Sequence, residues 1–356
     1  MRARTRRLAA ILGALTLTAA MTAGCSTVRA AATWNDPRVP VAGSGATGAA
    51  TVPSMGASAS ASSSSNGFVG PAYDVTPLLH PSRKYLGVEI DGAPGSITPA
   101  KNFASWIGAK PNLIGQYVGW GTSFDAAAAS NAWSYGAMDF VVWEPWATTM
   151  AKIAAGGSDA YITAYATAIR ELNVPIAISF GHEFNGNWYP WGTTGTTPAQ
   201  FVAAWKHIHD LFAAAGATNV IWIWDPNDIF PVPDVKLSQY YPGDDYVDWV
   251  GVTGYWSQAG PNSYSTLYLP TLTEIRGFTE KPFIIAETAV ESGSDELRSL
   301  SDLFAAVEQH SDILGFVWYD YNKGGDWRVE NRPTLESAFR NDLASSTFGF
   351  NASEAR

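Results

Sequence analysis

Eight short apolar runs, separated by stretches of helical periodicity, constrain the fold of this chain more than any other feature. Because each run is apolar throughout, with no alternation, the pattern is typical of parallel strands covered on both faces. Amphipathic stretches lie between several of the runs, and eight βα units between residues 80 and 345 predict a (β/α)8 barrel. The runs are KYLGVEID, PNLIGQYVGW, AMDFVVWEPW, VPIAISFGHE, NVIWIWDPN, YVDWVGVTGYW, KPFIIAETA and ILGFVWYDYN, and the clearest helical stretches are residues 158–173, 197–216 and 294–310.

The helix after the second run is the weakest part of this pattern, because only SFDAAAAS at residues 123–130 could form it. A doubly wound open sheet is the alternative architecture. The first run, however, ends in EIDGAPG, which is not a glycine-rich nucleotide loop. No internal repeat accompanies the pattern. We therefore predict a single barrel domain at residues 76–350.

The first 75 residues have a different composition. MRARTRR, an apolar stretch and TAGC predict a signal peptide at residues 1–24, and TAGC resembles the bacterial lipoprotein box. The resemblance implies that Cys25, the only cysteine, carries a lipid, while Arg6-Arg7 also permits twin-arginine export. Residues 25–75, which include GASASASSSS, predict a flexible linker. We expect the protein at the extracellular face of the cell membrane, or secreted.

The charge of the chain limits its partners. The formal net charge is −10, which argues against nucleic acid or an anionic membrane surface as a partner, whereas a neutral polymer would be indifferent to it. We expect no cofactor and no metal site, since His207 and His209 lie two apart on a helix and point to different faces. The chain is expected to be a monomer that meets the membrane only through Cys25.

Carboxylates and aromatic rings gather where the predicted strands end. Glu183 and Glu287 end the fourth and seventh runs, and barrels present their catalytic groups at this end of the strands. Sugar rings stack on indole faces, and a pair of carboxylic acids hydrolyses glycosidic bonds. The pattern therefore predicts a glycosidase, and the further residues predicted to contact sugar are Trp120, Trp143, Glu144, Trp188 and Trp191.

Several motifs, in order, carry a resemblance to a known family. HEFNGNWYPWG at residues 182–192 is similar to the His-Glu-Met-Asn-Gly signature of glycoside hydrolase family 26, with Phe184 in place of Met. VIWIWDPN, YYPGDDYVDWVGVTGY, PFIIAET and FVWYDYNK continue the match. The resemblance implies a retaining (β/α)8 glycosidase in which Glu183 is the acid/base and Glu287 the nucleophile. It also implies that His182, Tyr255 and Trp318 bind substrate.

The family resemblance implies an endo-β-glycanase for a β-1,4-linked polysaccharide, with mannan or glucomannan first. Because the family also contains enzymes for mixed-linkage β-glucan and β-1,3-xylan, these two polymers are alternative substrates. A non-catalytic, lipid-anchored carbohydrate-binding protein is a further alternative, as is a solute-binding lipoprotein. Glu144 could bind sugar or hold a loop, Trp188 and Trp191 could contact substrate or pack their loop, and Asp225 and Asn227 are expected to support the site.

Overall fold

The computed structural model describes residues 70–344 and 347–355. The predicted signal peptide, Cys25 and most of the predicted linker lie outside these residues. Within them, no helix has the length and apolar character needed to cross a membrane.

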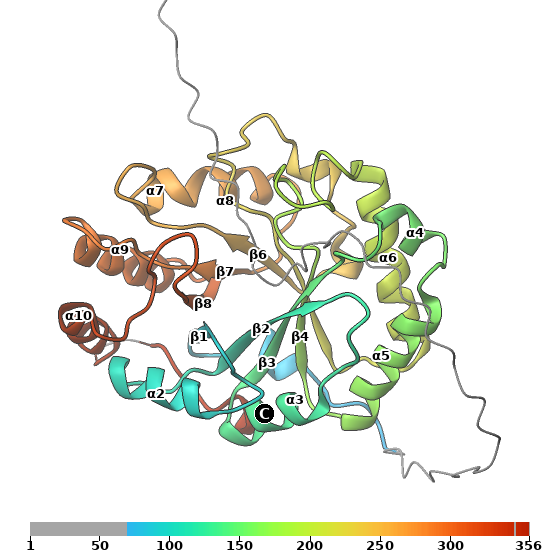
Figure 1. The fold of residues 1–356 in the computed structure, drawn as a ribbon, viewed down its shortest axis with the longest axis horizontal. Helices are drawn as coiled ribbons and strands as arrows, with labels where there is room; N and C mark the ends of the chain where they lie inside the picture. Colours follow the sequence, from blue (N-terminus) through green and yellow to red (C-terminus); the bar gives the residue numbers. More distant parts are fainter. Residues whose placement is uncertain (1–69, 345–346, 356) are drawn as a thin grey trace, which may run out of the picture. The chain divides into compact units, whose positions relative to one another are not determined.

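Eight parallel strands close into a barrel in the order of the sequence, with β1 pairing with both β2 and β8 (Figure 1). This confirms the predicted (β/α)8 architecture, and every strand lies within one of the eight apolar runs. The strands are β1 Tyr85–Ile90, β2 Leu113–Gly119, β3 Met138–Glu144, β4 Ile176–Phe180, β5 Val220–Trp224, β6 Trp249–Thr253, β7 Phe283–Thr288 and β8 Ile313–Asp320.

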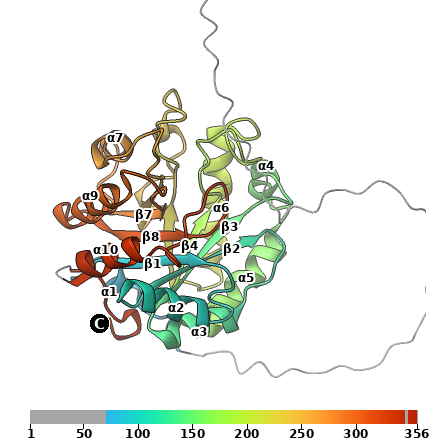
Figure 2. The same ribbon diagram turned by 60° about the vertical axis from the view of Figure 1, so that its left-hand side comes forward.

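Helices surround the strands (Figures 1 and 2). The weakly predicted helix after β2 is present as α3, and Asp125 caps its N-terminus by accepting hydrogen bonds from two backbone N–H groups. After β5, two short 3-10 helices stand in place of an α-helix. The helices are α1 Thr76–Leu79, α2 Thr98–Ile107, α3 Ala126–Tyr135, α4 Met150–Ala154, α5 Asp159–Leu172, α6 Pro198–Ala214, α7 Tyr264–Leu267, α8 Leu269–Arg276, α9 Glu296–Gln309 and α10 Pro333–Ala344, with 3-10 helices η1 Leu237–Gln239, η2 Asp244–Tyr246 and η3 Ala352–Glu354.

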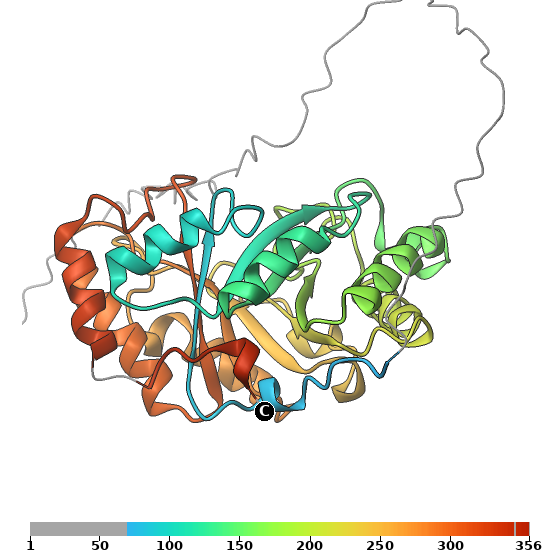
Figure 3. The ribbon, with the colours of Figure 1, turned by 90° about the horizontal axis from the view of Figure 1, so that it is seen from below.

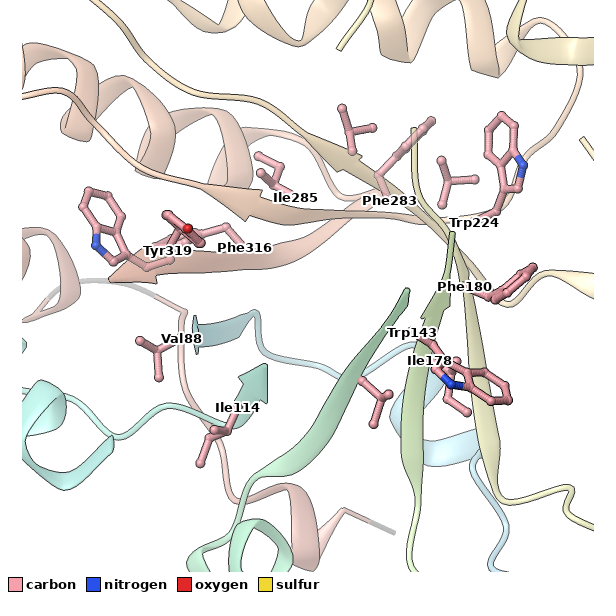
Figure 4. Close-up of a cluster of buried hydrophobic side chains, with 14 of the residues drawn as sticks. Val88, Ile114, Trp143, Ile178, Phe180, Trp224, Phe283, Ile285, Phe316 and Tyr319 are labelled. Atoms are coloured by element: carbon pink, nitrogen blue, oxygen red, sulfur yellow. The ribbon is translucent and has the colours of Figure 1, made fainter. Parts of the chain in front are cut away.

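The core has two layers, because side chains along a strand point alternately to its two faces. One cluster of buried side chains includes Phe140, Ile223 and Val317, which fill the inside of the barrel. A larger cluster packs the outer face of the strands against the helices, and Figure 4 shows part of it, including Trp143 and Phe180. The strand position of a residue therefore decides whether it can reach the barrel mouth.

The two ends of the described chain close one end of the barrel. Figure 3 shows α1 beside the C-terminal segment, and the rings of Tyr85 and Phe350 lie 4.9 Å apart there. Contacts with the barrel extend beyond the predicted boundaries at residues 76 and 350, since Tyr73 N donates to Asn173 Oδ1 at 2.8 Å and Ala352 is buried. Because this end carries the N-terminal ends of the strands, the opposite end is left for a site.

Candidate active site

Glu183 stands on a strained turn directly after β4. Its backbone has φ 52°, in the left-handed region that non-glycine residues rarely adopt, and Gly181 has φ 59°. The Glu183 N–H donates to the Asp225 carbonyl at 2.8 Å, which ties the turn to the end of β5. Strain of this kind persists where surrounding contacts hold it, and it is concentrated at functional sites. The turn places a carboxyl group at the mouth that is only 9% exposed.

Glu287 lies inside β7 and is also 9% exposed. Two tyrosine hydroxyls contact its two carboxylate oxygens: Tyr255, after β6, at Oε1 and Tyr117, in β2, at Oε2. Hydrogen bonds to a carboxylate stabilise its charged form and fix its orientation. The two hydroxyls thus fix the orientation of the Glu287 carboxyl group.

The surroundings of Glu183 favour its protonated form. Burial raises the pKa of Glu183 well above its ordinary value, and the nearby charge of Glu287 raises it further. The Trp188 indole N–H donates to Glu183 Oε2 at 2.6 Å and opposes this by lowering the pKa. A carboxylic acid kept protonated by burial beside a second carboxylate is the arrangement that a glycosidase needs in its proton donor.

Two more buried acidic side chains lie near this pair. Glu89 in β1 is 0% exposed and lies 2.8 Å from the Tyr117 hydroxyl through Oε2. Asp225, after β5, accepts a bond from Ser179 Oγ at 3.2 Å, and burial followed by the Glu287 charge raises its pKa. Asp225 takes the supporting position that was expected of it.

The sequence analysis missed Glu89, Tyr117 and Tyr319 as site residues. The Tyr319 ring lies 6.4 Å from that of Tyr117 and 5.8 Å from that of Tyr255, so it borders the same mouth. Strand alternation carries the missing signal, because Tyr117 shares its face of β2 with Leu113, which is inside the barrel.

His182 and the loops after β4 and β5 complete the site. His182 is buried between the rings of Tyr189, at 4.9 Å, and Tyr117, at 6.0 Å. Asn185 and Asn227 bind each other reciprocally: Asn185 Nδ2 donates to the Asn227 carbonyl at 2.9 Å, and the Asn227 N–H donates to Asn185 Oδ1 at 2.8 Å. These bonds fix the two loops together, which is the supporting role expected for Asn227.

Two predicted sugar contacts are wrong, because each ring lies on the face of its strand that is turned to the helices. Trp143 in β3 is fully buried in the cluster of Figure 4, and its ring stacks on Tyr165 of α5 at 4.5 Å. Trp318 in β8 is likewise fully buried and packs edge-on against Phe339 of α10 at 4.9 Å. Both rings belong to the layer between strands and helices, so neither can form a platform for sugar.

The other predicted rings divide between packing and the site. Trp120 is half-buried, and one face of its ring stacks on Trp143 at 4.6 Å. Trp191 is 2% exposed and stacks on Tyr189 at 4.4 Å, so it packs its own loop and offers no free face to substrate. Only Trp188, half-buried, touches a carboxyl group of the pair.

Glu144 remains beside the site but is covered. It ends β3, is buried, and its charge acts on both Glu89 and Tyr189. Its backbone carbonyl accepts the N–H groups of Trp120 and Trp146, which holds the loops that follow β2 and β3. Across residues 70–344 and 347–355, no three His, Cys, Asp or Glu side chains are grouped as metal ligands would be.

The model of glycosyl hydrolase family 26 matches residues 151–324, which include both glutamates. Endoglucanase H of Acetivibrio thermocellus is 29% identical over 270 residues, and a mannan endo-1,4-beta-mannosidase of Thermothelomyces thermophilus is 30% identical over 177 residues. These matches support membership of glycoside hydrolase family 26. The first alignment spans 72% of this chain and 30% of the relative, and the second 49% and 31%. The chain thus spans about a third of the length of the curated relatives it matches.

Solved structures from family 26 share the barrel. A β-mannanase from Bacteroides ovatus aligns with a TM-score of 0.57 at 17% identity, covering 77% of this chain and 92% of that chain. A modular endo-β-1,4-mannanase from Cellulomonas fimi aligns with a TM-score of 0.59 at 18% identity, covering 78% and 74%. At such identities the likeness concerns the fold.

Proposed function

We propose that the chain is a retaining endo-β-glycanase that hydrolyses a β-1,4-linked polysaccharide. The observation that supports this most is the contrast between two buried carboxyl groups at one barrel mouth. Glu183 is surrounded so that it keeps a proton, whereas Glu287 accepts hydrogen bonds from two tyrosines. A proton donor and an oriented nucleophile are the two components of double displacement.

In the first step, a Glu287 oxygen forms a bond to the anomeric carbon while the bond from that carbon to the leaving oxygen breaks. Glu183 gives its proton to the leaving oxygen. In the second step, Glu183, now a carboxylate, accepts a proton from water. The water oxygen bonds to the anomeric carbon, the bond to Glu287 breaks, and the configuration at that carbon is retained.

Two sugars compete as the repeating unit. Mannan comes first, because several relatives are mannan endo-1,4-beta-mannosidases. A β-glucan is the second candidate, because the match to Endoglucanase H extends over more of this chain, 72% against 42% to 50%. The outward position of Trp318 removes a substrate contact that the family resemblance had implied for every one of these polymers, so it does not separate them. Two relatives are beta-1,3-xylanases, so β-1,3-xylan is tested beside the other two polymers.

The test compares the full chain with Glu183→Ala and Glu287→Ala on glucomannan, linear mannan, mixed-linkage β-glucan and β-1,3-xylan. We expect oligosaccharide release from a β-1,4-linked polymer and loss of release in both variants. Glu183→Ala should still react with an aryl glycoside whose leaving group needs no proton, and azide should rescue Glu287→Ala with inverted product. Normal turnover by either variant would remove the role assigned to that residue. Tight binding to a polymer without any release would favour the carbohydrate-binding alternative.

A further inference from the structure

A buried carboxyl group that the two-step reaction does not use lies directly behind the proposed nucleophile. We propose that Glu89 is a positioning residue that holds its own proton and donates it in a hydrogen bond to Tyr117, so that the Tyr117 hydroxyl directs its single proton to Glu287. This inference rests on the proposed function, because it assigns a task to Glu89 in the reaction of Glu287.

The number of protons available at the Tyr117 hydroxyl favours a proton on Glu89. The Tyr117 hydroxyl contacts Glu89 Oε2 at 2.8 Å and also contacts Glu287 Oε2. A tyrosine hydroxyl has one proton to donate and lone pairs to accept with. If both glutamates were ionised, one of them would face the lone pairs of the phenol oxygen. With a proton on Glu89, both contacts have a donor and an acceptor, and the chain of bonds runs in one direction, from Glu89 through Tyr117 to Glu287.

The buried position of Glu89 also favours its protonated form, because few contacts there would stabilise a charge. Glu89 is 0% exposed, and no described residue donates to its Oε1. A neutral acid with one unpaired oxygen is far less costly there than a carboxylate, which would lose the solvation of a full charge. Burial, then the charge of Glu287, raises the pKa of Glu89 well above its ordinary value. Asp225 and Glu144 act in the same direction, while the Tyr117 hydrogen bond opposes them.

The Glu89 side chain occupies the space that a side chain at position 115 would otherwise fill. Glu89 pairs with Gly115 across β1 and β2, and a Cβ on Gly115 would lie 2.3 Å from Glu89 Cγ. A real Cβ could not approach so closely, so the absence of a side chain at Gly115 lets Glu89 lie across β2 toward Tyr117. Because Glu89 is fully covered, it can act on substrate only through Tyr117.

The closing experiment uses three variants of the full chain. Glu89→Gln keeps a donor in its amide NH2 group, and Glu89→Met has similar size but no donor. Tyr117→Phe removes the hydroxyl between the two glutamates. The first readout is the infrared spectrum at neutral pH, which separates protonated from ionised carboxyl groups, with Glu183→Gln as the control that identifies the band of the acid/base.

We expect the wild-type spectrum to contain a protonated-carboxyl band that Glu89→Gln removes and that Tyr117→Phe shifts. Loss of an ionised-carboxylate band instead would overturn the proposal. If Glu89→Gln does not fold, Tyr117→Phe still decides, because an unchanged protonated band in that variant would also refute it. This readout needs no turnover, so it remains informative even if no polysaccharide is cleaved and the proposed function fails.

The second readout is kcat/KM against pH on an activated aryl β-glycoside. Glu89→Gln should stay within a few-fold of wild type, and Tyr117→Phe should lose about tenfold or more, as expected for one hydrogen bond to a charged group. Glu89→Met should lose more than Glu89→Gln and less than Tyr117→Phe, because the Tyr117 hydroxyl remains but no donor directs its proton to Glu287. In Tyr117→Phe the acid limb should move to higher pH, because the charged form of Glu287 has lost a donor. A purely structural role predicts lower stability with an unmoved limb, and equal losses in Glu89→Gln and Glu89→Met would refute the donor role.

Discussion

The hydrogen bond from Trp188 to the proposed acid/base offers the sharpest test of the site. Trp188→Phe removes the indole N–H that lies 2.6 Å from Glu183 Oε2 while keeping an aromatic ring at the position. The bond stabilises the ionised form of Glu183, and its loss should raise the pKa of Glu183 further. Because the first step needs protonated Glu183, activity should persist to higher pH in the variant.

The size of the effect follows from the nature of the bond. A hydrogen bond to a charged group is worth about 1.5–3 kcal/mol, and about 1.4 kcal/mol is a factor of ten in an equilibrium constant. At a given alkaline pH, the ratio of protonated to ionised Glu183 should therefore increase by about tenfold or more. At acidic pH, substrates with poor leaving groups should react somewhat more slowly, since a proton held more tightly is transferred less readily.

The assay is kcat/KM against pH, and Trp191→Phe is the matched control from the same loop. The Trp191 indole N–H donates to the His182 carbonyl at 2.7 Å. Removing that N–H therefore does not change the hydrogen-bond partners of the Glu183 carboxyl group. We expect the basic limb to move to higher pH in Trp188→Phe and to stay in place in Trp191→Phe. A basic limb that stays in place or moves to lower pH in Trp188→Phe would refute the assignment of that limb to Glu183.

Two further predictions test the packing and the buried charges. Trp318→Ala should lower the free energy of unfolding by about 3–5 kcal/mol in a urea titration, because the ring is fully buried against α10, while KM for polysaccharide stays unchanged. Burial raises the pKa of Asp139 from 3.8 to about 7, so its contribution to stability is present below about pH 4 and is lost as the pH rises through about 7. Over this range the free energy of unfolding of wild type should fall by up to about 4 kcal/mol relative to Asp139→Asn, as urea unfolding at a series of pH values would measure. The same dependence of unfolding free energy on pH in both proteins would contradict the reasoning.

The barrel could be predicted because its signals are local and repeated. Each strand is a short apolar run, and the three clearest predicted helices begin and end within two residues of the structure, as for 158–173 and α5 Asp159–Leu172. The two glutamates could be placed at the mouth for the same reason, since strand ends in a barrel converge. The 3-10 helices after β5 were not predicted, because the linking segment has no strong periodicity.

The positions of the tryptophans could not be read from strand ends alone. A strand turns successive side chains to opposite faces, so a shift of one residue decides between the barrel mouth and the helical layer. Trp318 and Tyr319 are adjacent, yet Trp318 packs on α10 and Tyr319 borders the Tyr117 and Tyr255 rings. Choosing the largest ring at the end of a run ignored this alternation, and the same alternation would have revealed Tyr117.

Two glycines explain how four carboxyl groups fit into one buried layer. Gly115 leaves room for Glu89, and Gly251 does the same for Asp225, since a Cβ there would lie 2.7 Å from Asp225 Cγ. Glu183 and Glu287 complete the layer. Four charges at such proximity and burial would repel one another strongly, so the layer must retain protons at neutral pH.

The proposed reaction uses only one of those protons, on Glu183. A proton on Glu89 would lower the negative charge beside Glu287, whose carboxyl oxygens contact the Tyr117 and Tyr255 hydroxyls. Replacing Gly115 with a larger residue would displace Glu89 and disturb this distribution of protons, although Gly115 never meets substrate. Beneath the mouth, the residues that leave space thus determine the chemistry as much as the residues that carry charge.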